Sequence, residues 1–120
     1  MAIDRLDQML QFQSEALKLR SQRQELLAAN IANADTPQYK AVDIDFGQAL
    51  AAATAPGAGT SGTSAAPSVL YRVPTQSSLD GNTVEMDVER AQFADNTVRY
   101  EAALRVLNAQ IKAMLIALQG

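Results

Sequence analysis

The 120-residue chain contains no cysteine and no histidine. A disulfide framework and a thiolate metal site are therefore excluded, as are ordinary zinc sites and nucleophilic sites of the Ser-His-acid or Cys-His kind. The glycines at positions 57, 59 and 62 lie in a Ser/Thr/Ala-rich stretch with no following Lys-Ser/Thr pair, so they do not form a phosphate-binding loop. The sequence predicts no enzymatic activity, no cofactor and no bound metal ion.

Aromatic residues are also scarce, and the excess of one sign of charge over the other is small. The chain has three Tyr, three Phe and no Trp, and its apolar content comes mainly from aliphatic residues and Met at helical spacing. That composition favours helices packed on helices over a sandwich or a doubly wound sheet. The net charge of −3 comes from intermixed acids and bases without a basic patch, so we expect no nucleic-acid partner.

Long apolar runs are absent as well. No stretch approaches the roughly 18 consecutive apolar residues of a transmembrane segment. The first residues lack the basic and apolar regions of a secretory signal peptide, so we expect no cleaved signal of that kind. The length suits one domain.

The strongest helical pattern lies in residues 82–118. Residues at alternating steps of four and three form what we call the predicted seam, the spacing of a left-handed coiled coil, which only Thr97 interrupts: Phe93, Thr97, Tyr100, Leu104, Leu107, Ile111, Met114 and Leu118. A second stripe follows a neighbouring face: Val88, Ala91, Ala94, Val98, Ala102, Val106, Ala109, Ala113 and Ile116. Because the apolar surface exceeds one seam, we expect this helix to have more than one neighbour.

The start of this helix is predicted at Asn82. Glu85 follows three residues later, as in a capping box, directly after the turn pair Asp80-Gly81. The helix would then run from Thr83 to about Leu118, with nothing inside it that is Gly or Pro.

A second helix is predicted over residues 3–33, ending where Asp35, Thr36 and Pro37 disfavour helix. Its apolar residues occupy two adjacent stripes, the first formed by Ile3, Leu6, Leu10, Leu17, Leu27 and Ile31, the second by Met9, Phe12, Ala16, Leu19 and Leu26. Packing of this face on the chain's own core is the ordinary interpretation. Two such helices side by side cannot cover all of this apolar surface, so part of it should meet other chains.

Between the helices the pattern is mostly extended. Residues 42–46 alternate apolar and acidic side chains, and residues 69–73 form a second candidate strand that Pro74 stops. These two segments are candidates for a short β-hairpin. Residues 48–55 have the pattern of one or two helical turns, and residues 56–67 that of a low-complexity linker.

These patterns together predict a mainly α fold. Long N- and C-terminal helices form a coiled-coil pair in residues 1–36 and 82–120. Residues 37–81 join them through an extended arm, the linker and the short strands.

Two groups of acidic residues need an interpretation. Asp43 and Asp45 lie on one face of the first candidate strand, where a solvated face is favoured over a divalent-cation site because no third oxygen ligand has suitable spacing. A second group lies near the predicted start of the C-terminal helix, where acids stabilise the helix dipole and need no catalytic role: Asp80, Glu85, Asp87 and Glu89.

Residues 27–40 read Leu-Ala-Ala-Asn-Ile-Ala-Asn-Ala-Asp-Thr-Pro-Gln-Tyr-Lys. This stretch resembles the N-terminal signature of the bacterial flagellar rod and hook proteins, whose usual form is Asn-Ile-Ala-Asn-Ala/Thr-x-Thr-x-Gly-Tyr-Lys. The matching residues are Asn30, Ile31, Ala32, Asn33, Ala34, Thr36, Tyr39 and Lys40. Gln38 stands where the signature has Gly, so if that Gly has positive φ, Gln38 must use another conformation or accept a small strain.

Three further segments are similar to the proximal rod proteins of this family, namely residues 40–46, 80–90 and 118–120. The resemblance implies a structural subunit of the flagellar basal body, exported unfolded by the type III apparatus without a cleaved signal. It would form part of the periplasmic drive shaft that transmits torque and encloses the export channel. The implied partners are copies of itself, other rod proteins, the rod-base adaptor and MS ring, and the export gate.

The resemblance also implies that the terminal helices build the inner coiled-coil tube of the rod. We therefore expect the assembly interface to draw on both helices. Its candidate residues are Leu6, Leu10, Leu17, Leu27, Asn30, Ile31, Asn33, Phe93, Tyr100, Leu104, Leu107, Ile111, Met114 and Leu118.

Two alternatives stay open at this point. One is another proximal rod protein of the same family. The other, from a different class, is a soluble helical-hairpin module such as a secretion adaptor or chaperone. An adaptor would be folded in solution, whereas a rod subunit should be partly disordered until it joins its neighbours.

Overall fold

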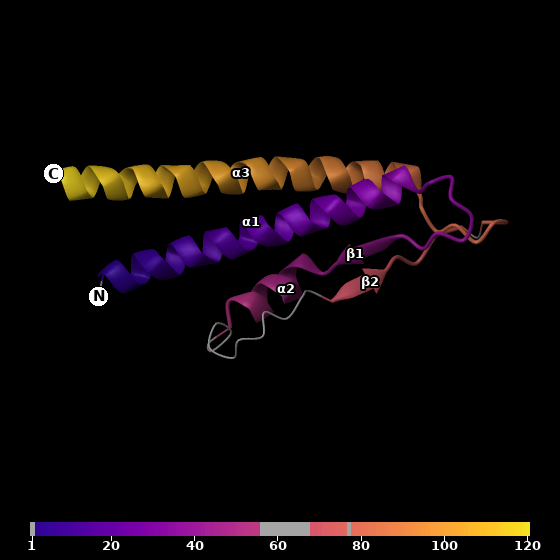
Figure 1. The fold of residues 1–120 in the computed structure, drawn as a ribbon, viewed down its shortest axis with the longest axis horizontal. Coiled ribbons are helices and arrows are strands. Elements are labelled where there is room, and N and C mark those ends of the chain that lie inside the picture. Colours follow the sequence, from indigo (N-terminus) through magenta and orange to yellow (C-terminus); the bar gives the residue numbers. More distant parts are fainter. Residues whose placement is uncertain (1, 56–67, 77) are drawn as a thin grey trace.

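The computed structural model describes residues 2–55, 68–76 and 78–120. Five elements follow one another in the order α1 (Ala2–Ala32), β1 (Val42–Ile44), α2 (Phe46–Ala53), β2 (Val69–Tyr71) and α3 (Met86–Gln119). The molecule is elongated, about 64 × 30 × 18 Å, because α1 and α3 run side by side in opposite directions along its length (Figure 1). The predicted fold class, mainly α with two long terminal helices packed together, is confirmed.

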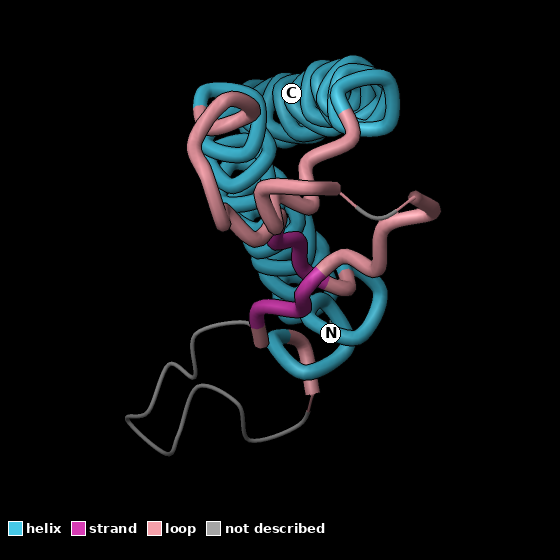
Figure 2. The backbone as a smooth tube through the Cα atoms, turned by 90° about the vertical axis from the view of Figure 1, so that its right-hand side faces the viewer, coloured by secondary structure: helices cyan, strands magenta, loops and turns pink. Residues whose placement is uncertain are grey.

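The helix α1 occupies the middle layer of the molecule. It contacts α3 on one side and both β1 and α2 on another, and the strands and α2 lie below α3 in both views (Figure 1, Figure 2). The small buried apolar core is spread along this layer and consists of Ala16, Leu19, Leu27, Ala41 and Ile44. Two separate partners explain why the apolar residues of α1 follow two stripes.

The two strands pair antiparallel, as predicted, with Val42 opposite Tyr71 and Ile44 opposite Val69. The first strand is shorter than the alternating pattern indicated, because the Asp45 side chain accepts a hydrogen bond from the Gln48 amide (3.1 Å) and caps α2. The helical turns predicted for residues 48–55 are therefore present but begin at Phe46. The predicted linker, residues 56–67, lies outside the described residues.

The predicted start of the C-terminal helix was wrong. This helix, α3, begins at Met86, its N-cap is Glu85, and no side chain caps it. Asn82 instead donates from Nδ2 to the carbonyls of residues 33, 34 and 36 (3.0, 3.0 and 2.7 Å). The Glu85 carboxylate accepts hydrogen bonds from the backbone and hydroxyl of Thr75. Asn82 and Glu85 therefore form hydrogen bonds with residues more distant in the sequence instead of the predicted capping box.

The face of α3 that packs on α1 is rotated from the predicted seam. Its least exposed residues recur at steps of three and four and are Phe93, Asn96, Tyr100, Ala103, Leu107, Gln110 and Met114. Five of the eight residues of the predicted seam lie on this side, including Thr97, which accepts a hydrogen bond from Gln24 of α1 (2.7 Å), but Leu104, Ile111 and Leu118 are exposed. The pattern misled because polar Asn96 and Gln110 occupy inward positions: the Asn96 amide donates to the Arg20 carbonyl (2.9 Å) and to Gln24 Oε1 (2.7 Å).

Candidate functional site

The signature segment that follows α1 is fixed first by Asn30, whose side chain is fully buried. Its Nδ2 donates to the Val42 carbonyl (2.7 Å) and its Oδ1 accepts from the Val42 amide (3.1 Å). The same Nδ2 donates to Glu89 Oε2 (2.9 Å). Asn30 therefore pairs with β1 as a neighbouring strand residue would, and joins the last turns of α1 to β1 and α3.

The end of α1 is closed by Asn33, Thr36 and Asn82. The Nδ2 of Asn33 donates to the Ala29 carbonyl (2.8 Å), and the Thr36 hydroxyl donates to Asn33 Oδ1 (3.1 Å). Asn82 Nδ2 lies among the carbonyls that the end of the helix leaves free. The side chains of two asparagines and a threonine thus terminate α1, whereas in many helices a glycine after the last turn ends the helix.

The rest of the signature runs beside residues 80–83. The Gln38 amide donates to the Asp80 carbonyl (2.9 Å), and the Lys40 ammonium donates to the Gly81 carbonyl (2.5 Å). Thr83 is bound twice, since its amide donates to the Tyr39 carbonyl (3.0 Å) and its hydroxyl accepts from the backbone amide of residue 41 (2.8 Å). Through these hydrogen bonds the signature connects the end of α1 to the segment before α3 within one chain.

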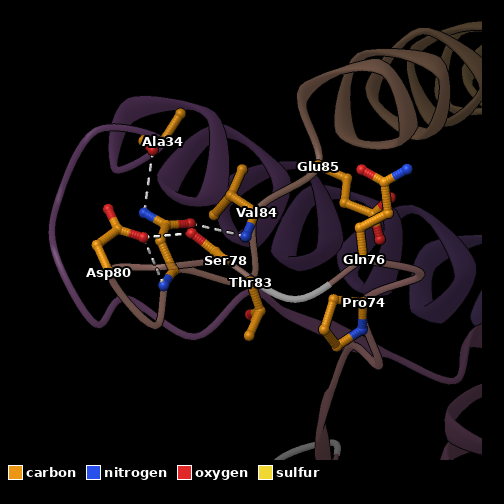
Figure 3. A pocket seen from close by; sticks show the side chains of 9 residues that line it. Ala34, Pro74, Gln76, Ser78, Asp80, Thr83, Val84 and Glu85 are labelled. Carbon is orange, nitrogen blue, oxygen red and sulfur yellow. Dashed lines mark hydrogen bonds between the residues drawn. The ribbon is translucent and has the colours of Figure 1, made fainter.

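An open pocket of about 270 Å³ lies beside these hydrogen bonds, and Ala34, Pro74, Asp80 and Glu85 are among the residues that line it (Figure 3). Its two carboxylates are already bound by donors of the chain itself: Asp80 accepts from the Ser78 hydroxyl and the Asn82 amide, and Glu85 accepts from Thr75. These hydrogen bonds lower the pKa of Asp80 and of Glu85. Among the described residues no group of three or more acidic side chains gathers as metal ligands would, so we assign this pocket no ligand.

Of the two conformations left open for Gln38, the structure has the strained one. Its φ is +63°, in the left-handed region that costs a residue with a Cβ about 1 kcal/mol. The hydrogen bond from its amide to the Asp80 carbonyl holds it there. The strain is local, and it explains why the signature has glycine at this place.

Gln38→Gly should therefore raise the free energy of unfolding by about 0.5 kcal/mol, because the relief of strain slightly exceeds the added entropy of the unfolded chain. Gln11→Gly, at an exposed position inside α1, should lower it by about 1 kcal/mol. Urea unfolding of both variants measures the two signs. Equal losses in both would contradict the assignment of strain to Gln38.

A charged cluster at the centre of the molecule joins four elements. Arg23 of α1 holds Asp43 of β1 through Nε and Nη2 (2.9 and 3.1 Å). Arg72, next to β2, reaches Asp43 (2.8 Å) and Glu89 of α3 (2.6 Å from its Nε to Oε1). The exposed fractions of the side chains are 13, 14, 19 and 0% for Arg23, Asp43, Arg72 and Glu89. We call these four residues the charge cluster.

The charge cluster corrects one prediction and adds to another. Asp43 is neither on a solvated face nor a cation ligand, since two guanidinium groups hold it. Glu89 is an acid of the first turn of α3, as predicted, but it is also fully buried between Arg72 and Asn30. One signal could have found Glu89: it precedes Phe93 and Asn96 at the same steps of four and three that place those residues on α1.

The electrostatics of Asp43 give a pH dependence. Burial alone would raise the pKa of Asp43, but the hydrogen bonds from Arg23 and from the Ile44 amide, with the charges of Arg23 and Arg72, lower it below its ordinary value. The unfolded chain therefore binds the proton more readily than the folded one. The stability that Asp43 contributes is complete above its ordinary pKa and is lost as the pH falls toward the folded pKa.

We expect the free energy of unfolding to fall as the pH is lowered below about 4, the ordinary range of an aspartate. Asp43→Asn should be less stable than the original chain at pH 6, and the difference should shrink toward pH 3. Urea midpoints across that range measure it. A difference between the two chains that is independent of pH would contradict the assignment to Asp43.

The predicted interface residues fall into three groups by exposure. Leu27 and Asn30 are fully buried within the chain, so no neighbouring subunit can reach them in this conformation. Half-buried residues are Leu10, Leu17, Ile31, Asn33, Phe93, Tyr100, Leu107 and Met114. Exposed ones are Leu6, Leu104, Ile111 and Leu118.

Most of the second predicted stripe of α3 is exposed. Val98 is 66% and Ile116 61% exposed, and Val106 and the alanines of the stripe are also exposed. At about 3.6 residues per turn, Val98 and Ile116 point directly away from Leu107, which packs toward α1. We call Val98, Ala102, Ala109, Ala113 and Ile116 the outer stripe.

No helix in the described parts of the chain is long and apolar enough to cross a membrane. Comparison with known proteins matches residues 10–40 to the family of the flagella basal body rod protein. The chain is 52% identical over 135 aligned residues to the flagellar basal body rod protein FlgB of Salmonella typhimurium, an alignment that covers 98% of each protein. It is 48% identical to FlgB of Escherichia coli over the same coverage.

FlgB of Cereibacter sphaeroides is 47% identical over 116 residues, which cover 89% of this chain and 91% of that protein. The alignments thus extend far beyond the signature, across α1, the strands and α3. They confirm the resemblance to the proximal rod proteins. The chain belongs to the family of the flagellar basal body rod protein FlgB and is a structural subunit of the flagellar rod.

Proposed function

We propose that this chain polymerises, with copies of itself and with other rod proteins, into the proximal segment of the flagellar rod. In this segment the terminal helices form the wall that transmits torque and encloses the export channel. The observation that carries the proposal is the outer stripe, whose Val98 and Ile116 are about two-thirds exposed. A continuous apolar stripe on a water-facing helix is stable when a neighbour covers it.

The charge cluster supports the same role. A shaft subunit must pass force from its helices to the arm formed by β1 and β2, and the ion pairs across four elements resist such shearing. The proposal includes the rod-base adaptor, the MS ring and the export gate as further partners. It also includes export through the flagellar type III apparatus and assembly on the periplasmic side.

The test is Val98→Asp in a strain that has no other copy of the gene. We expect loss of swimming and an absence of the subunit from purified basal bodies, because the substitution buries an unpaired carboxylate in the subunit contact. Export is measured separately, by the amount of the variant outside the cytoplasm, so that failed assembly is distinguished from failed secretion.

The matched control is Ser14→Asp, which adds the same charge at an exposed position of α1, outside the outer stripe. This variant should swim normally. Normal swimming of Val98→Asp would show that the outer stripe is not an assembly surface, and loss of swimming in both variants would attribute the effect to added negative charge in general.

A further inference from the structure

The two long helices separate toward their free ends (Figure 1). A groove of about 340 Å³ in this region is lined by Arg5, Gln8, Met9, Phe12, Gln13 and Gln110. Its apolar part is formed by Met9 and Phe12, which are 47 and 44% exposed. We call this the terminal groove.

The terminal groove continues the face of α1 that is buried farther along the helix. Met9 lies one heptad before Ala16, and Phe12 one heptad before Leu19, and both later residues belong to the core. The same face is thus covered by the chain's own elements in its second half and uncovered in its first. It is a core surface that lacks a partner.

We infer that the terminal groove receives the outer stripe of α3 from a second copy of this chain. The inference rests on the proposed function, in which copies polymerise, and it specifies which two surfaces meet. The outer stripe has three alanines between Val98 and Ile116, so another backbone can approach it closely. The Met9 and Phe12 side chains of the groove are long enough to fill the space over those alanines.

Charge complementarity favours the same pairing. The first half of α1 carries Asp4, Asp7 and Glu15 against a single base, Arg5, which lines the groove. The segment of the outer stripe, residues 98–116, carries Arg99, Arg105 and Lys112 against a single acid, Glu101. By helix geometry Asp4 and Glu15 lie on one flank of the terminal groove, and Arg105 and Lys112, with Glu101, lie on one flank of the outer stripe. Opposite charges would therefore face each other across the contact and set its orientation.

The pairing also has the symmetry that a rod requires. The terminal groove and the outer stripe are different surfaces of one subunit, so a contact between them is heterologous and leaves one groove and one stripe free at the two ends. Repetition adds subunits without closing a dimer. A contact of the stripe with itself would be isologous and would stop at two copies.

The absence of cysteine allows a test by cross-linking in assembled basal bodies. Met9→Cys subunits are expressed together with subunits that carry one cysteine in the outer stripe, at Ala102, Ala109 or Ile116 in turn. We expect a cross-linked dimer with at least one of the three stripe positions. The control partner Leu104→Cys, which is exposed and points at least about 120° away from every residue of the outer stripe, should give at least tenfold less.

A second variant keeps the test decisive. If Met9→Cys subunits do not enter basal bodies, Gln8→Cys, from the same groove, replaces them. Where the cysteine subunits assemble and the cells swim, cross-links of the groove only to itself, only to another rod protein, or to nothing would overturn the inference and leave the rod function standing. An absence of the original chain from basal bodies would instead overturn the proposed function.

Charge reversal gives an independent measurement. Lys112→Glu should reduce incorporation into basal bodies at least tenfold, because it faces Glu15 with a like charge. The double variant Lys112→Glu, Glu15→Lys restores opposite charges and should recover most of the loss. Equal incorporation of the single variant and the original chain, or no recovery in the double variant, contradicts the pairing of these two flanks.

Discussion

Glu89→Ala should lower the free energy of unfolding of the isolated subunit by about 3 kcal/mol. Glu89 is fully buried, its Oε1 lies 2.6 Å from Arg72 Nε, and its Oε2 accepts from Asn30. Removing one partner of a buried ion pair costs about 3–5 kcal/mol because the other charge is left without compensation. The lower value applies here, since Arg72 keeps its contact with Asp43.

The loss is large against the total stability of a small domain, about 5–15 kcal/mol. Urea unfolding followed by circular dichroism measures it. Asp95→Asn is the matched control, because it removes an acid of the same helix that pairs with Arg99 at 3.0 Å while both side chains are more than half exposed. Such a surface pair contributes about 0.5 kcal/mol or less. A similar small loss in Glu89→Ala would show that the charge cluster does not hold α3 to the strands.

Glu89→Gln separates charge from packing. The amide keeps the volume of the side chain and an oxygen that can accept from Asn30, but it gives up the attraction to Arg72. We expect its stability to lie between the original chain and Glu89→Ala. A Gln variant as stable as the original would mean that shape and hydrogen bonding, and not charge, account for the contribution of Glu89 to stability.

The elements whose pattern is repeated over many residues could be predicted from the sequence. The long helices follow from apolar spacing, and the prediction of residues 3–33 differs from the observed α1 (Ala2–Ala32) by one residue at each end. The strand pair follows from the alternation of residues 42–46 and from the apolar run of residues 69–73 that Pro74 stops, although the first strand is shorter than predicted. In each case the local preference and the tertiary environment agree.

Residues whose partners lie far away in the chain could not be placed. Asn82 looks like a helix N-cap because only its next few neighbours are visible in the sequence, whereas its actual acceptors are about 50 positions earlier. Arg23, Asp43 and Glu89 each resemble ordinary surface charges for the same reason. Polar side chains buried by mutual pairing carry no periodic signal of their own, since their environment depends on the fold that they help to complete.

The distribution of these polar contacts leads to a prediction about the isolated subunit. All side-chain hydrogen bonds described between α1 and α3 lie between residues 20–30 and residues 89–97. Beyond them the helices separate and leave Met9 and Phe12 exposed. Helical segments of about 12–15 residues are marginal in water without tertiary contact. The free ends should therefore open far more often than the end that contains the charge cluster.

In a verified monomer at low micromolar concentration, we expect amide hydrogens of residues 4–15 and 104–118 to exchange about a hundredfold faster than those of residues 23–30 and 89–97, which corresponds to roughly 2.7 kcal/mol in local opening. Hydrogen exchange read by mass spectrometry measures it peptide by peptide. In assembled basal bodies the same free ends should become protected, because neighbouring subunits then cover them. Equal protection along both helices in the monomer would contradict assembly-coupled ordering, and it would favour instead a helical hairpin that is complete in solution, as a secretion adaptor would be.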